Sequence, residues 1–593
     1  MIKTTKIALS LLPLFIFIMS YAQKKEDFST GGLEKKLVTT YWDKDSTRMR
    51  SRGYYNVSGF SDLGQKTGKW TYWYYNGEVS ESSTYVNGKY HGKLTQLYEN
   101  GKPMNVGYFK YGIEDSLYTG YYENGTIAIK GFYAPVADSI LLAPHKYWAK
   151  LDYIEPVKIG EWHYYYENGK PKKTVEFKPN DTTEYLKSFW DKDGNQTVIN
   201  GNGVVKEYYA TKKPKLETTY TNGLPNGKYT EWNANGTVRV EGKYKNGLKE
   251  GEWKLWNFTS HTLYQLTNYK QGEKHGLFKE YTPDEILVIK GNYLEGEKDG
   301  IWEYYFENGA KDMIGGFKHD MQHGHWDYWY PNGQLYYEGS FVNGKKEGEW
   351  NFYYKTGEKW KSGHYQNDKK EGLWTTWYEN GQEAFEGKYE NGKEQGVWTS
   401  WYENGVMKDR GTFDAGKMNQ TWTGWYPNDQ KRYEGTYTND LKDGKWSFWN
   451  DKGVLKDVGY FKALKKPRGK KAILIETNTP ELQSYKHGKW VSYDEKGGAI
   501  ASEGTYSYGK QTGVWRFYYP GGKIVATENS FKDGKLDGVS KTFTRRGKPQ
   551  TEIGYKNGVK HGEMKIYDSK GRKLIAHKLY KNGKFKKDLL KRE

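Results

Sequence analysis

The residues best suited to chemistry are histidines, and several of them recur at one position relative to a repeated glycine. Histidines ligate metals only when several ligands converge on one centre. His323 and His325 are the closest pair, but they have no thiolate or carboxylate partner at metal-ligand spacing in the sequence. We therefore expect no metal site. Five of the 12 histidines directly precede a recurring glycine: His91, His275, His323, His487 and His561.

Carboxylates recur in the same way, which argues against an acid/base pair. Glu338, Glu386 and Glu434 each precede a glycine of a repeated unit, whereas the two carboxylates of a glycosidase form one unique pair. No P-loop, dinucleotide fingerprint or nucleophile elbow is present. The chain has no Cys, which excludes disulfides, thiolate zinc sites and cysteine nucleophiles. We expect no catalytic residue, no cofactor and no enzymatic activity.

Lysines form a third periodic set, two residues before the recurring glycine in nine units. In stacked units these lysines would form a row along one edge, partly neutralised by acids that follow them, such as Glu347. One interpretation is edge protection and solubility of a long sheet. The other is an anion-binding edge in a chain of formal charge +19. The candidate binding lysines are Lys298, Lys346, Lys370 and Lys442.

These positions recur because a unit of 24 residues repeats through most of the chain, as in 324–347, 348–371 and 372–395. Counted from its first glycine as zero, a unit has Trp at position two, aromatics at positions five and six, and Asn-Gly at eight and nine. Glu-Gly follows near fourteen and fifteen, then an aromatic at seventeen and a second Asn-Gly near twenty. Twenty such units fit between residues 68 and 583. Internal repetition at this period is typical of solenoids and arrays.

The pattern within a unit predicts strands. Apolar residues alternate with a period near two, and Tyr, Trp, Phe, Thr and Val dominate. Asn-Gly pairs such as Asn332-Gly333 supply the positive-φ residues of a type I′ hairpin turn, and a second loop such as 343–348 returns the chain. No helical period is present. We predict an all-β fold: an elongated single-sheet array of antiparallel β-hairpins with about 20 repeats, in which each hairpin contacts mainly its neighbours.

The tryptophans mark two faces of this array. Trp occupies position two in twelve units and position five in eight, and these positions point to opposite faces of a regular strand. The position-two row is the predicted core. The position-five row is either a second packed layer or an exposed aromatic ladder that binds a ligand. The candidate binding tryptophans are Trp329, Trp377, Trp401, Trp425 and Trp449.

The chain divides into four predicted segments. Residues 1–22 have the lysines, apolar run and small residues of a signal peptide, and the run of about 13 residues is shorter than the roughly 20 of a membrane span. An N-terminal cap follows (23–67), then the hairpin array (68–583) with about 20-residue insertions near 134–153 and 462–481, and a basic C-terminal tail (584–593). We expect export to the periplasm, the outer membrane or the exterior, and no transmembrane span in the mature chain.

Units of the form GxWxYWYxNGxxxxEGxYxNGKxxG resemble the MORN repeat variant of bacterial YwqK-like antitoxin proteins, over residues 68–583. The resemblance implies an all-β array of hairpins that has no known catalytic residue and is used for contacts with proteins or lipids. The chain departs from that family in its export signal and its length. A weaker similarity links it to the choline-binding repeats of cell-wall proteins, which have a shorter period and no Glu-Gly element.

Three functions follow from these observations. The first is an exported, non-enzymatic repeat scaffold that binds a protein or an anionic envelope component, namely a lipid, lipopolysaccharide or glycan. The second is a carbohydrate- or cell-wall-binding module that uses the aromatic ladder. The third is an antitoxin-like partner that neutralises a toxin. Nucleic acid is not an expected partner, because an exported basic protein meets envelope polymers instead.

Overall fold

The computed structural model describes residues 34–57, 63–134, 156–179, 181–465, 482–496 and 498–590. In these ranges the chain forms 44 β-strands and no helix, so none of the described residues belongs to a helix able to cross a membrane. The strands divide between two compact units, Met1–Glu285 and Ile286–Glu593. The prediction of an all-β array of antiparallel hairpins is confirmed.

In the first compact unit each strand pairs antiparallel with its neighbours in sequence, except that β5 and β6 share β4 as a partner. Its strands are β1 (Lys35–Tyr41), β2 (Met49–Val57), β3 (Leu63–Trp73), β4 (Val79–Val86), β5 (Lys89–Tyr90), β6 (Gly92–Leu97), β7 (Pro103–Lys110), β8 (Ile113–Tyr121), β9 (Ile127–Tyr133), β10 (Lys158–Tyr165), β11 (Pro171–Phe177), β12 (Tyr185–Trp190), β13 (Gln196–Ile199), β14 (Asn202–Tyr208), β15 (Pro214–Thr221), β16 (Leu224–Trp232), β17 (Val238–Lys245), β18 (Leu248–Trp256), β19 (Leu263–Lys270) and β20 (Glu273–Tyr281).

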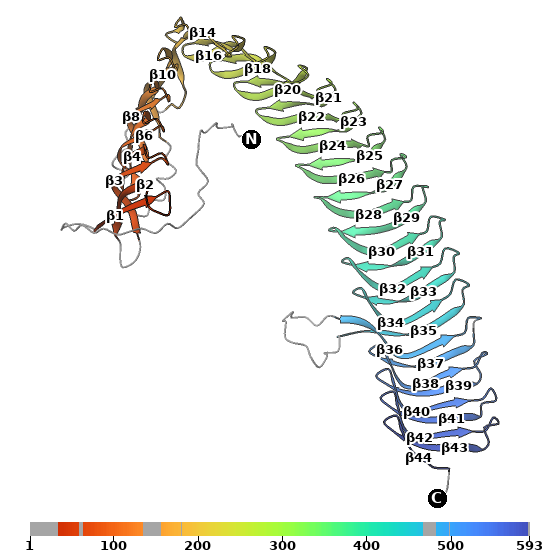
Figure 1. Cartoon of the computed structure of the whole chain (residues 1–593). Coiled ribbons are helices and arrows are strands. Elements are labelled where there is room, and N and C mark those ends of the chain that lie inside the picture. The colour runs from red at the N-terminus through yellow and green to blue at the C-terminus, as the bar shows by residue number, and fades with distance from the viewer. Residues whose placement is uncertain are drawn as a thin grey trace. The chain divides into compact units, whose positions relative to one another are not determined.

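In the second unit the strands again pair in sequence order, and the hairpins follow one another along the sheet (Figure 1). Its strands are β21 (Leu287–Leu294), β22 (Glu297–Tyr305), β23 (Lys311–Lys318), β24 (Met321–Trp329), β25 (Leu335–Val342), β26 (Lys345–Tyr353), β27 (Lys359–Gln366), β28 (Lys369–Trp377), β29 (Glu383–Glu390), β30 (Lys393–Trp401), β31 (Met407–Asp414), β32 (Lys417–Trp425), β33 (Lys431–Thr438), β34 (Leu441–Trp449), β35 (Leu455–Lys465), β36 (Leu482–Tyr493), β37 (Ile500–Ser507), β38 (Lys510–Tyr518), β39 (Val525–Lys532), β40 (Lys535–Phe543), β41 (Pro549–Lys556), β42 (Val559–Tyr567), β43 (Leu574–Lys581) and β44 (Lys584–Asp588).

The two Asn-Gly pairs of a unit form different turns, which corrects the predicted turn types. At Asn332-Gly333 only the glycine has a positive φ, 86°, and its N–H donates to the carbonyl of Tyr330 at 2.9 Å. This is a type I turn closed by a left-handed glycine, because the connection is too long for a type I′ turn. The type I′ turn lies instead at Asn343-Gly344, where φ is 49° and 77° and two residues join β25 to β26.

The core is the row of position-two tryptophans, as predicted. Eleven of the twelve are buried, and the twelfth, Trp398, is half-buried. These rings pack edge-on against position-seventeen aromatics of the preceding unit and of their own unit; for Trp350 these are Phe341 at 5.1 Å and Tyr365 at 5.8 Å between centroids. Stacked aromatic rings therefore supply the apolar volume that the few aliphatic residues cannot supply.

Each of these tryptophans lies flat over a glycine of the preceding strand, and this pairing makes the close packing possible. A Cβ atom on Gly363 would overlap the ring of Trp374, and the same holds for all twelve tryptophans. The indole N–H of Trp374 then donates to the carbonyl of His364, the residue after the glycine, at 3.0 Å. The glycine of the Glu-Gly element is thus required by the tryptophan of the next unit.

The described parts of the predicted segments all carry strands. Residues 34–57 of the predicted cap form β1 and β2, which pair with each other, and β2 pairs with β3. At the second insertion β35 and β36 run on in register to Lys465 and Leu482, and residues 584–588 form β44 against β43. The signal peptide prediction (1–22) and most of the two predicted insertions (135–155 and 466–481) lie outside the described residues.

Candidate functional site

Strand alternation gives each hairpin two distinct faces. Across β24 and β25, Trp326 pairs with Gly339, while the neighbouring pair Asp327 and Glu338 points to the other side of the sheet. We call the side with the position-two tryptophans the inner face and the opposite side the outer face. The predicted binding lysines and the predicted binding tryptophans lie on different faces.

The four candidate lysines pack on the inner face against core tryptophans. The Lys346 Nζ atom lies 4.4 Å from the ring centroid of Trp350. The same contact places Lys298 4.4 Å from Trp302, Lys370 4.5 Å from Trp374 and Lys442 4.2 Å from Trp446. These are cation–π contacts. They add to the predicted row that each ammonium group lies against the ring of the tryptophan on its own strand.

Burial lowers the pKa of these lysines, and this effect is measurable. We expect the Lys346, Lys370 and Lys442 amines to titrate below the same groups in the urea-unfolded chain, because desolvation disfavours the charged form. NMR of reductively methylated lysines would give the individual pKa values, and Lys346→Arg would assign one resonance. Equal pKa values in the folded and unfolded chains would show that these ammonium groups are solvated.

The five candidate tryptophans occupy the outer face, where all five are half-buried. The lysine that opens the second strand of the preceding unit approaches three of them. Lys311 lies 5.5 Å from Trp329, Lys359 lies 5.6 Å from Trp377, and Lys431 lies 5.3 Å from Trp449. Glu383 and Met407 occupy the equivalent positions before Trp401 and Trp425. The row is therefore partly accessible and differs in charge from unit to unit.

Hydrogen bonds between units fix the spacing of this row. The hydroxyl of Tyr354 donates to the carbonyl of Trp377 in the next unit at 2.9 Å, and Tyr378 donates to Trp401 at the same distance. Asn380 adds a bond from its side-chain amide to the carbonyl of Glu403 at 3.1 Å. The aromatic at position six and the Asn of the first turn thus hold consecutive units in register.

Aliphatic side chains widen the apolar part of the outer face. Ile301, Leu373 and Val397 occupy position one of their units, adjacent in sequence to inner-face tryptophans, and are 57%, 50% and 53% exposed. Alternation places them on the same side as the position-five tryptophans. The outer face therefore combines half-buried indoles with aliphatic side chains that are at least half exposed.

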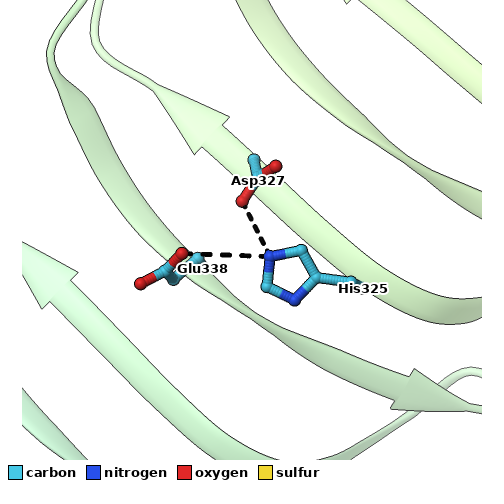
Figure 2. Close-up of side chains that lie close together, drawn as sticks. All are labelled: His325, Asp327 and Glu338. Atoms are coloured by element: carbon cyan, nitrogen blue, oxygen red, sulfur yellow. Dashed lines mark hydrogen bonds and ion pairs between the residues drawn. The ribbon is translucent and has the colours of Figure 1, made fainter.

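One group of metal-ligating residues also lies on the outer face. His325, Asp327 and Glu338 each offer one ligand atom, and these atoms lie within 4.8 Å of one another (Figure 2). The sequence did not predict this group because Glu338 is distant in the chain from His325. The feature that brings the three residues together is the cross-strand register, which places position three of a unit opposite position fourteen.

The comparisons with known proteins identify the repeat. The model of the MORN repeat variant matches nine segments: 66–87, 114–134, 158–178, 202–222, 225–246, 322–343, 370–391, 394–415 and 511–533. No curated protein matches the chain.

Solved structures resemble the chain only weakly. The crystal structures of TcdB2-TccC3-Cdc42 and TcdB2-TccC3 each have 10% sequence identity and a TM-score of 0.13, with 92% of this chain covered. A Photorhabdus luminescens Tc holotoxin pore has 10% identity and a TM-score of 0.12, with 93% covered. The chain spans only 28–32% of the length of these three chains, and at such TM-scores the likeness carries no argument. On its repeats and its hairpin array, the chain is a MORN repeat protein.

Proposed function

We propose that this protein is an exported, non-enzymatic scaffold that binds a protein partner through the outer face of its second compact unit, Ile286–Glu593. The observation that carries the proposal is the row of half-buried position-five tryptophans from Trp329 to Trp449, which recurs every 24 residues except where Tyr353 takes the place of a tryptophan. Export rests on the signal-peptide pattern of residues 1–22. The absence of catalysis rests on the periodic placement of histidines and carboxylates.

The outer face has the properties of a protein-binding surface. Tryptophan is enriched among the residues that dominate binding energies, and large exposed apolar patches mark interaction sites. Leu373 and Val397 flank the tryptophan row with half or more of their surface exposed. A repeat array offers such a surface over many units, so a partner can contact several equivalent positions at once. A toxin would be one partner of this kind.

A carbohydrate or cell-wall ligand is the second candidate, and the tryptophan row also favours it. Sugar rings stack on accessible indole faces, and a ladder at constant spacing suits a polymer. Lysines beside Trp329, Trp377 and Trp449 would attract an anionic glycan or lipid. The two candidates differ in salt dependence, because charge contacts at a surface are screened as ionic strength rises.

The test immobilises the full chain and applies fractionated cell envelope at about 50 and about 300 mM salt. The amount of envelope material that the chain retains is measured. We expect Trp377→Ala with Trp401→Ala to weaken retention at least about 10-fold. Thr375→Ala with Thr399→Ala is the matched control, because these threonines lie on the same face of the same strands. Equal retention by the tryptophan variant and wild type would contradict the proposal.

The identity of the retained material then separates the candidates. Salt-resistant retention of one defined protein supports the protein-binding scaffold. Retention of peptidoglycan or of a defined glycan supports the second candidate. Salt-sensitive retention of lipid or lipopolysaccharide that survives the tryptophan changes would assign binding to surface charge and remove the outer-face row from the mechanism.

A further inference from the structure

We propose that His325, Asp327 and Glu338 bind a divalent transition-metal ion, with Zn²⁺ as the reference ion. The proposal is independent of the scaffold function. The three side chains come from two adjacent strands, β24 and β25, and point toward one another on the outer face (Figure 2). One imidazole nitrogen and two carboxylate oxygens suit zinc and its neighbours in the first transition row, whereas calcium and magnesium prefer oxygen ligands alone.

The donor atoms already have the separation that a small metal ion requires. His325 Nε2 lies 2.9 Å from Asp327 Oδ1 and 3.8 Å from Glu338 Oε2. Zinc binds nitrogen and oxygen at about 2.0–2.2 Å, which places neighbouring ligand atoms roughly 3–3.5 Å apart. The two separations from the imidazole thus lie within about 0.3 Å of this range, and all three ligand atoms lie within 4.8 Å of one another. Because His325 is exposed, water can complete the coordination sphere.

Two negative charges lie directly opposite each other at this site, on Asp327 and Glu338. Asp327 and Glu338 face each other directly across the strand pair, and like charges so placed are destabilising. Other acids on the outer face meet a base across the ladder, as in Glu217–Lys206 at 3.5 Å and Glu303–Lys290 at 2.6 Å, or an uncharged residue, as in Glu386–Thr375.

Among the described residues, neither Asp327 nor Glu338 has a lysine or arginine within ion-pair distance; each has only His325. A divalent cation would supply the positive charge that this pair of strands lacks. A neighbouring tyrosine also orients one ligand. The hydroxyl of Tyr353 donates to Glu338 Oε1 at 2.8 Å, which leaves Oε2 as the oxygen facing the imidazole. Such outer hydrogen bonds are characteristic of metal ligands.

The test is calorimetric titration of the untagged full chain with ZnCl₂. We expect His325→Gln and Glu338→Gln each to abolish one zinc site or weaken it at least about 10-fold. The matched control is His319→Gln, because His319 lies 2.9 Å from Glu297 in an exposed pair to which no other described residue adds a third ligand. This control is expected to retain the wild-type stoichiometry.

A stability measurement gives an independent readout. In chelator, Asp327→Asn is expected to be at least as stable as wild type, because the substitution removes a like-charge contact. With ZnCl₂ only wild type should gain thermal stability, since a ligand that binds the folded state stabilises it. The proposal is wrong if His325→Gln binds as much zinc as wild type, or if CaCl₂ gives the same response as ZnCl₂.

Discussion

Gly363→Val is expected to unfold the hairpins around β27 and β28. A Cβ atom at this position would overlap the ring of Trp374, which is 4% exposed and bonds to the carbonyl of His364. The ring must leave its site, and loss of a buried tryptophan costs about 3–5 kcal/mol. Because each hairpin contacts mainly its neighbours, the loss spreads to adjacent units. Urea denaturation followed by circular dichroism measures the change.

Two comparisons make this prediction specific to the glycine and tryptophan pair. At Gly107 the next strand offers Tyr118, and a Cβ atom would lie 3.3 Å from its ring, so Gly107→Val should cost much less. Gly363→Thr with Trp374→Phe should recover most of the stability, because the paired residues Thr267 and Phe278 already occupy these positions. An unchanged urea midpoint for Gly363→Val would show that the glycine does not determine where the ring sits.

Raising the pH from about 10 to about 12 is expected to unfold the sheet cooperatively. Burial raises the pKa of Tyr220, Tyr304 and Tyr389 to about 12, whereas tyrosine in an unfolded chain titrates near 10. The folded state therefore keeps protons that the unfolded chain loses in this range. Their contribution to stability is complete below about pH 10 and disappears as the pH rises through the folded-state pKa values.

The alkaline transition can be followed by tyrosinate absorbance and circular dichroism on one sample. Both signals should change together above pH 10, and Tyr389→Phe should move the midpoint upward while Tyr75→Phe, at a residue 60% exposed, should not. The lysines with lowered pKa values act in the opposite direction, so stability is expected to rise slightly before it falls. Exposed tyrosines such as Tyr75 ionise near pH 10 in either state; complete tyrosinate formation by about pH 12 with an intact β-sheet signal would contradict the prediction.

Much of the fold was predictable because its determinants are local and repeat. Alternation of aromatic residues predicts strands, and it also separates Trp350 on the inner face from Tyr353 on the outer face. The position-two core was predictable for the same reason. The glycine beneath each tryptophan was also readable, since Gly339 precedes Trp350 in the sequence at the same interval as Thr267 precedes Phe278. That covariation within one chain is a packing signal.

Features that depend on register or side-chain direction were not predictable. The Asn-Gly pair predicts a type I′ turn at Asn332-Gly333, whereas this turn forms at Asn343-Gly344, because the residue pair is the same and only the loop length differs. The sequence placed Lys346 in a row without showing that its long side chain folds back over Trp350. The contact of His325 with Glu338 depends on the strand pairing that places Glu338 opposite Asp327, and the sequence does not show this register.

The pairing of glycine and tryptophan across unit boundaries affects which duplications of the gene keep the array intact. Gly363 belongs to one unit and Trp374 to the next, so the two halves of each contact are inherited from neighbouring segments. An in-frame duplication of one whole period, started at any codon, restores a glycine before every tryptophan. Extra residues between the two are tolerated where the flanking strands lengthen together, as between Gly459 and Trp490, which still pair. Duplication by whole periods preserves every contact without such an extension, which favours arrays that lengthen by unequal recombination.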